Sequence, residues 1–219
     1  MGRSTVSHRQ HPYPRGVTSR RFSALAAALV LSLSSGVAAA GIPTDQLRAS
    51  VDHVLATLQD PTLKPESMAA ERRAAIRRDA DAVFDFTEMA RRALGRHWQE
   101  LNEGQQREFV ELFANLLERA YVSKIEKYNG EKIAYIGESI EGDMATVKTQ
   151  ILTKQDTQVP IDYRLLHKGD RWLVYDVLLE GVSLVLNYRT QFDHILQTSS
   201  YDELIRRLKA NQAEYGGRS

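Results

Sequence analysis

The spacing of apolar residues changes after residue 130, and this change limits the folds open to the chain. Before Gly130, apolar positions recur every three or four residues, as they do in amphipathic helices. After it they alternate with polar positions, as in strands with one buried face. Helical spacing returns beyond Gly181. Helices followed by strands and then by helices predict an α+β fold.

Capping patterns mark the starts of the helices that precede the strands. Asp85 is a good N-cap, and Glu88 occupies the capping-box position three residues later. Asn102 and Gln105 repeat this pattern ahead of a wide apolar stripe, which predicts the longest helix of the domain. Two further helices are expected earlier in the chain, over residues 45–59 and 68–82.

Turn sequences divide the alternating region into four strands. Short turns containing Gly or Asp join antiparallel neighbours, so we expect a four-stranded antiparallel meander. After the sheet, Ser200 with Glu203 is expected to cap a last helix. Residues 212–219 are expected to form a polar tail, which leaves residues 41–211 as a single domain.

The first forty residues have the pattern of an export signal. A stretch with five arginines precedes a short apolar run, Ala24–Leu33, and a small-residue cleavage site, Ala38-Ala39-Ala40. The apolar run is too short to cross a bilayer as a helix. We therefore expect residues 1–40 to be removed on secretion. Arg20-Arg21 resembles a twin-arginine signal with altered spacing, so the general secretory route is favoured over the twin-arginine route.

Charge and composition exclude several classes of function. Removal of residues 1–40 takes the formal net charge from +1 to −4, which argues against binding to nucleic-acid phosphates. The chain has no cysteine, so thiolate catalysis and cysteine metal sites are excluded. The four histidines after residue 40 fall in different expected elements without metal-ligand spacing, so no metal is expected.

No catalytic motif is complete. The run from Gly181 to Val185 is similar to a nucleophile elbow but lacks the closing glycine, so Ser183 is interpreted as a helix cap or a polar group of a pocket. Asp176 and Glu180 are interpreted as structural. Tyrosines spread over the core helix, the strands and the following helix suit either the mouth of a ligand pocket or the ordinary edge of a core, and spacing alone favours the core edge.

From residue 84 to about residue 208 the chain resembles the MlaC family, the periplasmic phospholipid-binding proteins of the maintenance-of-lipid-asymmetry system, also called the toluene-tolerance family. The resemblance is carried by these segments: Phe84-Asp85-Phe86, Leu94-Gly95-Arg96-His97-Trp98, Pro160-Ile161-Asp162-Tyr163-Arg164-Leu165, Trp172-Leu173-Val174-Tyr175-Asp176-Val177 and Glu180-Gly181-Val182-Ser183-Leu184-Val185.

The resemblance implies a sheet curved against helices that enclose an apolar cavity for phospholipid acyl chains. It also implies a periplasmic carrier that shuttles lipid between an outer-membrane lipoprotein–porin complex and an inner-membrane ABC transporter, without cofactor or metal, and a monomer is expected. The residues expected to bind lipid come from the core helix, the sheet and the helix after it: Phe109, Phe113, Tyr121, Val147, Ile151, Ile161, Tyr163, Val177, Ser183, Leu184, Val185 and Tyr188.

Two alternatives to a lipid carrier remain open from the sequence. One is an enzyme with a cone-shaped α+β pocket for a small apolar substrate, with Asp176 or His97 as the base. The other is a protein-binding or chaperone-like module with a filled core. The first requires a base that faces a pocket, and the second requires an interior without room for a ligand.

Overall fold

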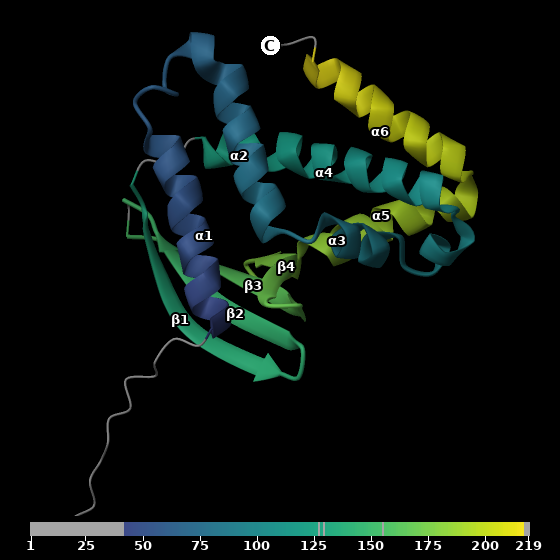
Figure 1. Cartoon of the computed structure of the whole chain (residues 1–219). Helices are drawn as coiled ribbons and strands as arrows, with labels where there is room; N and C mark the ends of the chain where they lie inside the picture. The colour runs from purple at the N-terminus through teal and green to yellow at the C-terminus, as the bar shows by residue number, and fades with distance from the viewer. Residues whose placement is uncertain (1–41, 127, 129, 155, 217–219) are drawn as a thin grey trace, which may run out of the picture. The chain divides into compact units, whose positions relative to one another are not determined.

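The order of the elements confirms the predicted α+β class. The computed structural model describes residues 42–216, except residues 127, 129 and 155, and shows helices, then a sheet, then helices (Figure 1). The predicted export signal and residues 217–219 lie outside the described residues.

Two of the helices before the sheet begin at the predicted caps. Asp85 accepts a hydrogen bond from the Glu88 backbone N–H at 2.9 Å, and the Asn102–Gln105 capping box is complete. The Glu88 side chain does not complete the first box, because it binds Arg91 and Arg92 instead. The elements are α1 (Ile42–Gln59), the 3₁₀ segment η1 (Glu66–Met68), α2 (Ala69–Val83), α3 (Phe86–Leu94), the 3₁₀ segment η2 (Gly95–Glu100) and α4 (Glu103–Ile125).

The sheet is an antiparallel meander with one strand more than predicted. Its strands lie in sequence order as β1 (Lys132–Glu141), β2 (Met144–Leu152), β3 (Gln158–Lys168), β4 (Arg171–Leu179) and β5 (Val182–Ser183). The prediction missed β5 because two residues are too few to show an alternating pattern. The turn before β5 has φ of 50° at Glu180 and 81° at Gly181, which is the geometry of a two-residue hairpin.

A bulge in β4 changes which residues share a face of the sheet. Leu165 pairs with Val174, whereas Tyr163 pairs with Val177, so the pairing skips one residue on β4. Val174 and Val177 therefore lie on the same face although they are three residues apart. Strict alternation along β4 does not predict this.

Two helices follow the sheet, α5 (Leu184–Thr198) and α6 (Tyr201–Gly216). The Ser200 hydroxyl accepts a hydrogen bond from the Glu203 N–H at 3.2 Å, as the capping pattern predicted. α6 continues to Gly216 and so includes the first five residues of the segment that was expected to form a polar tail. The segment after residue 211 contains no proline, so nothing in its backbone chemistry ends the helix before that glycine.

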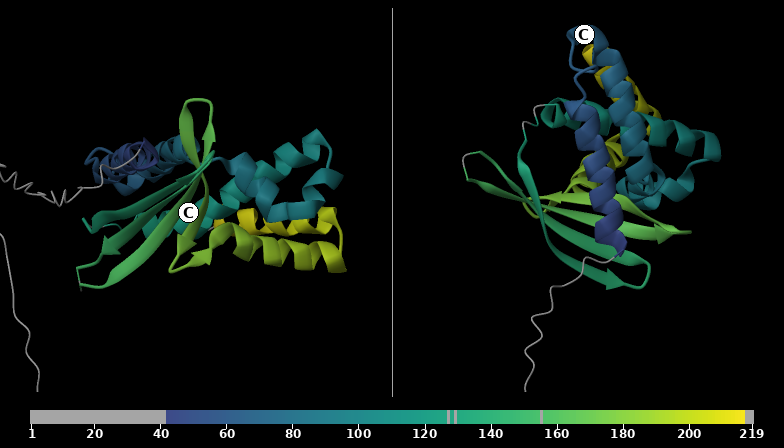
Figure 2. Two further views of the ribbon diagram at one scale, coloured as in Figure 1. Left: turned by 90° about the horizontal axis from the view of Figure 1, so that it is seen from below. Right: turned by 60° about the vertical axis from the view of Figure 1, so that its left-hand side comes forward.

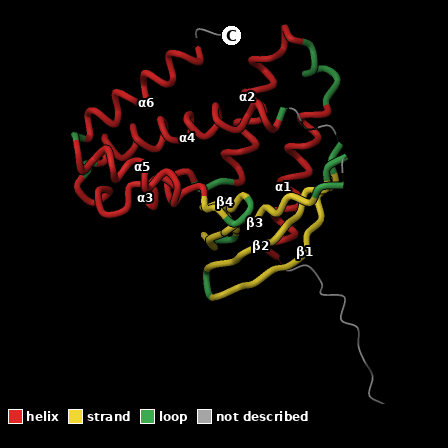
Figure 3. Tube along the Cα trace, turned by 180° about the vertical axis from the view of Figure 1, so that it is seen from behind, coloured by secondary structure: helices red, strands yellow, loops and turns green. Residues whose placement is uncertain are grey.

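The helices form two groups around the sheet. α1 crosses one face of the sheet, where the Thr44 backbone N–H and hydroxyl donate to Glu138 of β1 (Figures 1 and 2). α4 packs on α3 and α6, and α3 packs on α5. Figure 3 shows this second group from behind, at the β4 side of the sheet. None of the helices in residues 42–216 has the length and apolar composition needed to cross a bilayer.

Candidate functional site

The buried apolar residues fall into two clusters. The helical cluster contains residues of α3, η2, α4, α5 and α6, among them Met89, Trp98, Phe109, Phe113, Phe192 and Leu204. The sheet cluster joins α1 to the strands and consists of Leu47, Ala145, Val147, Leu165 and Val174. Val177 of β4 is half-buried and packs against both clusters. The buried interior therefore consists of two clusters that meet at Val177.

Five of the predicted lipid-binding residues lie inside these clusters. Phe109 and Phe113 have no exposed surface, and their rings stack with centroids 5.8 Å apart. Leu184 and Val185 are buried in the same helical cluster, and Val147 is buried in the sheet cluster. Their surfaces are covered by the protein's own side chains. In this structure these five residues support the elements around the site.

Other predicted residues lie on surfaces that are only half-buried. Ile151, Ile161 and Tyr163 share one face of β2 and β3, next to the sheet cluster, while Tyr121 and Tyr188 extend from α4 and α5. Neither Ile151 nor Ile161 packs against a buried cluster. We define a half-buried zone that contains these five residues and six more. The six are Val54, Leu55 and Leu58 of α1, Val122 of α4, and Ile133 and Tyr135 of β1.

The two helices of the half-buried zone stop packing tightly at their middle. The buried residues of α1 end at Leu47, although apolar residues continue to Leu58. Among the described side chains of α4, none beyond Leu117 is buried, although Tyr121 and Val122 follow. α4 packs on α3 and α6 and has at most slight contact with the described strands. The second half of α1, the end of α4 and the half-buried face of the sheet thus remain incompletely covered by protein.

Tyrosines in this zone lie deep in the protein yet keep accessible surface. Burial raises the pKa of Tyr163 to about 12, although its side chain is only half-buried by surface area. Burial likewise raises the pKa of Tyr135 to about 12 and raises the pKa values of Tyr121 and Tyr188. Many protein atoms surround these residues, yet none of the four is fully buried. Such an environment suits an apolar ligand with a polar end.

Ser183 and Asp176 fix α5 at the edge of the sheet. The Ser183 hydroxyl accepts from the Leu186 N–H at 3.0 Å and donates to the buried Asp176 carboxylate at 2.7 Å. Asp176 also accepts from the Val185 N–H at 3.0 Å and from Arg164 at 3.3 Å. This bonding confirms Ser183 as the α5 N-cap and gives Asp176 a structural role. Through it β4 holds Tyr188 in place.

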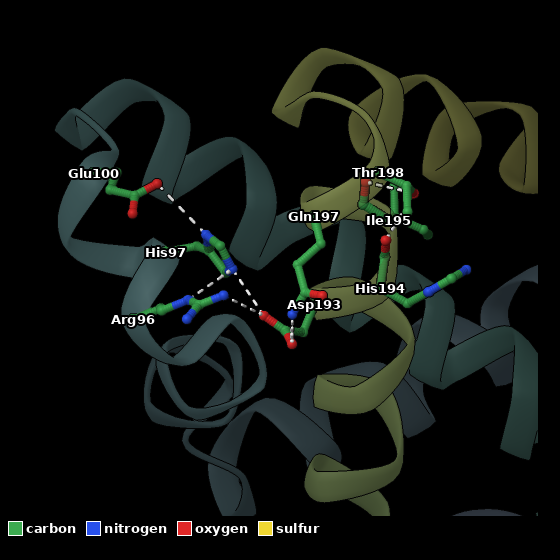
Figure 4. Close-up of polar contacts among 8 residues, drawn as sticks. All are labelled: Arg96, His97, Glu100, Asp193, His194, Ile195, Gln197 and Thr198. Atoms are coloured by element: carbon green, nitrogen blue, oxygen red, sulfur yellow. Dashed lines mark hydrogen bonds and ion pairs between the residues drawn. The ribbon is translucent and has the colours of Figure 1, made fainter.

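His97 lies outside the half-buried zone, in a polar cluster that joins η2 to α5 (Figure 4). Its Nε2 is 3.0 Å from Asp193 Oδ1, and its Nδ1 is 3.5 Å from Glu100 Oε2. The hydrogen bond from His97 and the charge of Arg96 lower the pKa of the Asp193 carboxyl. Both ring nitrogens of His97 thus face carboxylates, which is an arrangement that fastens two elements together.

Two surface pockets lie away from the predicted residues. One, of about 250 Å³, is lined by Leu94, Arg96, Leu186, Arg189, Thr190 and Asp193. The other, of about 540 Å³, lies between α2, α3 and α4 and is lined partly by Arg77, Phe86, Trp98 and Val110. Neither includes any of the twelve residues predicted to bind lipid. The described residues also contain no group of three or more His, Asp or Glu side chains placed to hold a metal ion.

Comparison with known proteins decides the family. The family described as MlaC protein matches residues 48–210, which is most of the chain. The chain belongs to the MlaC family. An MlaC relative, the intermembrane phospholipid transport system binding protein MlaC of Haemophilus influenzae, is 24% identical over 147 residues, covering 65% of this chain and 69% of the relative.

A solved structure shares the MlaC-type fold. It is the phospholipid-binding protein from Ralstonia solanacearum, in complex with a phospholipid, with a TM-score of 0.69 and 25% sequence identity. The similarity covers 78% of this chain and 97% of the Ralstonia chain. The resemblance stated from the sequence motifs is therefore confirmed at the level of family and fold.

The sequence-based choice of residues included none from α1 or β1, although both elements contribute apolar residues to the half-buried zone. Val54, Leu55 and Leu58 continue the apolar stripe of α1, and Tyr135 lies on β1 beside Thr149 of β2. The length of this apolar stripe could have indicated that α1 takes part in the zone. It was not used because spacing shows which face of a helix is apolar and not what covers that face.

Proposed function

We propose that this protein carries phospholipid, with the acyl chains lying against the half-buried zone. The observation that carries this proposal is that the apolar residues of the half-buried zone on α1, α4 and the sheet are incompletely covered by protein, and that α4 has at most slight contact with the described strands. An acyl chain of about sixteen carbons costs roughly 12 kcal/mol to expose to water, at about 0.8 kcal/mol per CH₂. Incompletely covered apolar surface of this kind is what such a chain needs.

The route of the lipid is part of the same proposal. The export pattern in residues 1–40 supports a periplasmic location, where free diffusion of phospholipid is negligible. The Haemophilus relative is named as a binding protein of an intermembrane phospholipid transport system. This name supports lipid traffic between membranes. The proposed traffic runs between an outer-membrane lipoprotein–porin complex and an inner-membrane ABC transporter, with the protein acting as a monomer.

The contacts of the two residues considered as catalytic bases favour a carrier over an enzyme. Asp176 accepts hydrogen bonds from Ser183, the Val185 N–H and Arg164, all of which organise the start of α5. His97 faces Asp193 and Glu100 and lies outside the half-buried zone. Neither group faces an apolar pocket where a substrate would meet it. The Haemophilus and Ralstonia proteins are likewise named for binding and transport.

The test is to express the full chain with its own export segment and recover the protein from the periplasm without added lipid. Native mass spectrometry should find phospholipid bound at close to one molecule per chain. Ile161→Glu should remove it, because a carboxylate in the zone would have to be desolvated by the tails. Ile140→Glu is the matched control, because Ile140 lies on the same sheet with 51% exposure.

Two outcomes would contradict the proposal. One is a folded wild-type protein recovered without phospholipid from the periplasm. The other is full retention of lipid by the Ile161→Glu variant, since the zone would then not be the place where the tails lie. Location is tested separately, by comparing the periplasmic and cytoplasmic fractions of the same cells.

A further inference from the structure

Several polar groups on the α1-facing side of the sheet are paired, whereas two tyrosine hydroxyls there have no hydrogen-bond partner among the described residues. Glu138 accepts two hydrogen bonds from Thr44, and the Thr149 hydroxyl donates to the Ile161 carbonyl at 2.7 Å. The Tyr135 hydroxyl is buried without a hydrogen-bond partner. Within the described part of the chain, the Tyr163 hydroxyl makes no hydrogen bond either. Two phenol groups are thus left free to bind something else.

The two tyrosines lie on the same face of the sheet, on the two strands that flank β2. Tyr135 pairs across the sheet with Thr149, and Tyr163 pairs with Val147, which is two residues before Thr149 on the same strand. The Arg48 guanidinium lies 4.1 Å from the centre of the Tyr135 ring, so α1 covers and orients that ring. The charge of Tyr135 also contributes to the raised pKa of Tyr163, as expected for groups that lie near each other.

A hydrocarbon tail alone cannot satisfy these hydroxyls. A buried donor without an acceptor is destabilising, whereas the same donor bound to an acceptor oxygen stabilises the complex. In a phospholipid, the acceptors nearest to the tails are the carbonyl oxygens of the acyl esters. The apolar residues next to the pair, Ile151 and Ile161, then receive the first part of a tail.

We propose that Tyr135 and Tyr163 bind the ester carbonyls of the phospholipid, so that the half-buried zone selects acyl esters as well as hydrocarbon. This inference rests on the proposed function and adds the chemical class of lipid that the site prefers. The selection concerns the linkage between glycerol and tail, and it is independent of the head group.

The test compares a diester phosphatidylcholine with its dialkyl ether analogue of equal chain length, in competition for the lipid-free wild-type protein. Each hydrogen bond that the ether cannot make corresponds to a factor of roughly threefold to tenfold in favour of the diester, so two bonds correspond to roughly tenfold to a hundredfold. Tyr135→Phe and Tyr163→Phe should each reduce this ratio, and the double variant should bring it close to one. Affinity for the ether should stay the same or rise, because the unpaired hydroxyl has gone.

Tyr201→Phe is the matched control. Burial raises the pKa of Tyr201 to about 12 as well, but its hydroxyl already donates to the Gln105 carbonyl at 2.8 Å, in the helical part of the protein. This variant should keep the wild-type ratio of diester to ether. Thermal melting of each lipid-free variant shows whether it is folded. If one single variant does not fold, the other still tests the inference.

The outcomes separate this inference from the proposed function. Binding of neither lipid by the wild-type protein would overturn the carrier proposal and the inference with it. Equal binding of both lipids would leave the carrier intact and overturn the inference, because water would then satisfy the hydroxyls as well as an ester does. An unchanged preference in the double variant would also overturn it, since the selectivity would come from other residues.

Discussion

The helical cluster and the half-buried zone use the same kinds of residue for opposite purposes. In the helical cluster, Phe113 and Phe192 meet edge to face at 5.5 Å and leave no room between elements. In the half-buried zone, Tyr121, Ile151 and Ile161 are equally apolar but incompletely covered. The comparison shows that burial by the protein's own side chains stabilises the fold, whereas surface left uncovered is available to a ligand.

The largest expected effect comes from the helical cluster. Phe113→Ala should lower the free energy of unfolding by about 3–5 kcal/mol, because it removes a fully buried ring and leaves a cavity. Urea denaturation of the lipid-free protein measures this change. A loss below about 1 kcal/mol would show that the cluster is not tightly packed, and the comparison between the two regions would fail.

The next effect uses pH to probe the depth of Tyr163. Its folded-state pKa of about 12 lies above the usual value of 10. The unfolded chain therefore loses its proton first, and stability present below pH 10 is lost as pH rises towards 12. The loss for this residue is at most about 3 kcal/mol. Urea denaturation at pH 9 and pH 11 should show a smaller decrease for Tyr163→Phe than for the wild type.

That pH comparison has its own control. Lysines also titrate in this range, so the quantity to compare is the difference between the variant and the wild type at each pH. Equal decreases in the two proteins would mean that Tyr163 is hydrated like an exposed tyrosine. The half-buried zone would then be open to water and unsuited to hold a tail.

A smaller effect is expected at the junction of the two regions. Ser183→Ala removes the N-cap of α5 and its bond to Asp176, which should cost about 1 kcal/mol of stability. Ser183→Thr keeps the hydroxyl and should cost less than the alanine variant. Thermal melting of both variants checks this order, and equal melting temperatures would show that the cap contributes little.

The smallest effect on stability should come from the half-buried zone itself. Ile151→Val removes one methylene group from a side chain that packs against neither cluster, so the lipid-free protein should lose less than about 0.5 kcal/mol. Leu165→Ala in the sheet cluster, where exposure is 1%, should lose about 2–5 kcal/mol. Similar losses at both positions would mean that the zone is as tightly packed as the core.

Local chemistry made much of the fold predictable. Asp85, Asn102 and Ser183 cap the helices at which the sequence placed them, because a cap depends only on a side-chain oxygen and the next few N–H groups. The change from helical to alternating spacing also marked the sheet, because the alternation follows from the local geometry of a strand with one buried face. β5 and the end of α6 were not predicted, since β5 depends on pairing with β4 and the polar composition beyond residue 211 gave no sign of helix.

The candidate site could be predicted only in part. Phe113 and Tyr121 share a face of α4 and were expected to contact lipid together, yet Phe113 is fully buried and Tyr121 is half-buried. The difference lies in what packs on each residue. Tyr188 of α5 packs edge to face on Phe113, whereas no strand packs closely on α4 near Tyr121. The bulge in β4, opposite Arg164 and Leu165 of β3, likewise decided which β4 residues join the face of Tyr163.

By itself, the sequence determined the class of fold, the starts of the capped helices and the family, because these depend on short-range spacing and on motifs read along the chain. Only the tertiary structure decided which apolar residues form solid core and which remain uncovered, and that Tyr135 is left with a buried, unpaired hydroxyl. The physical reason is that a residue's own chemistry makes burial favourable, but the neighbours brought to it by the fold decide what covers it.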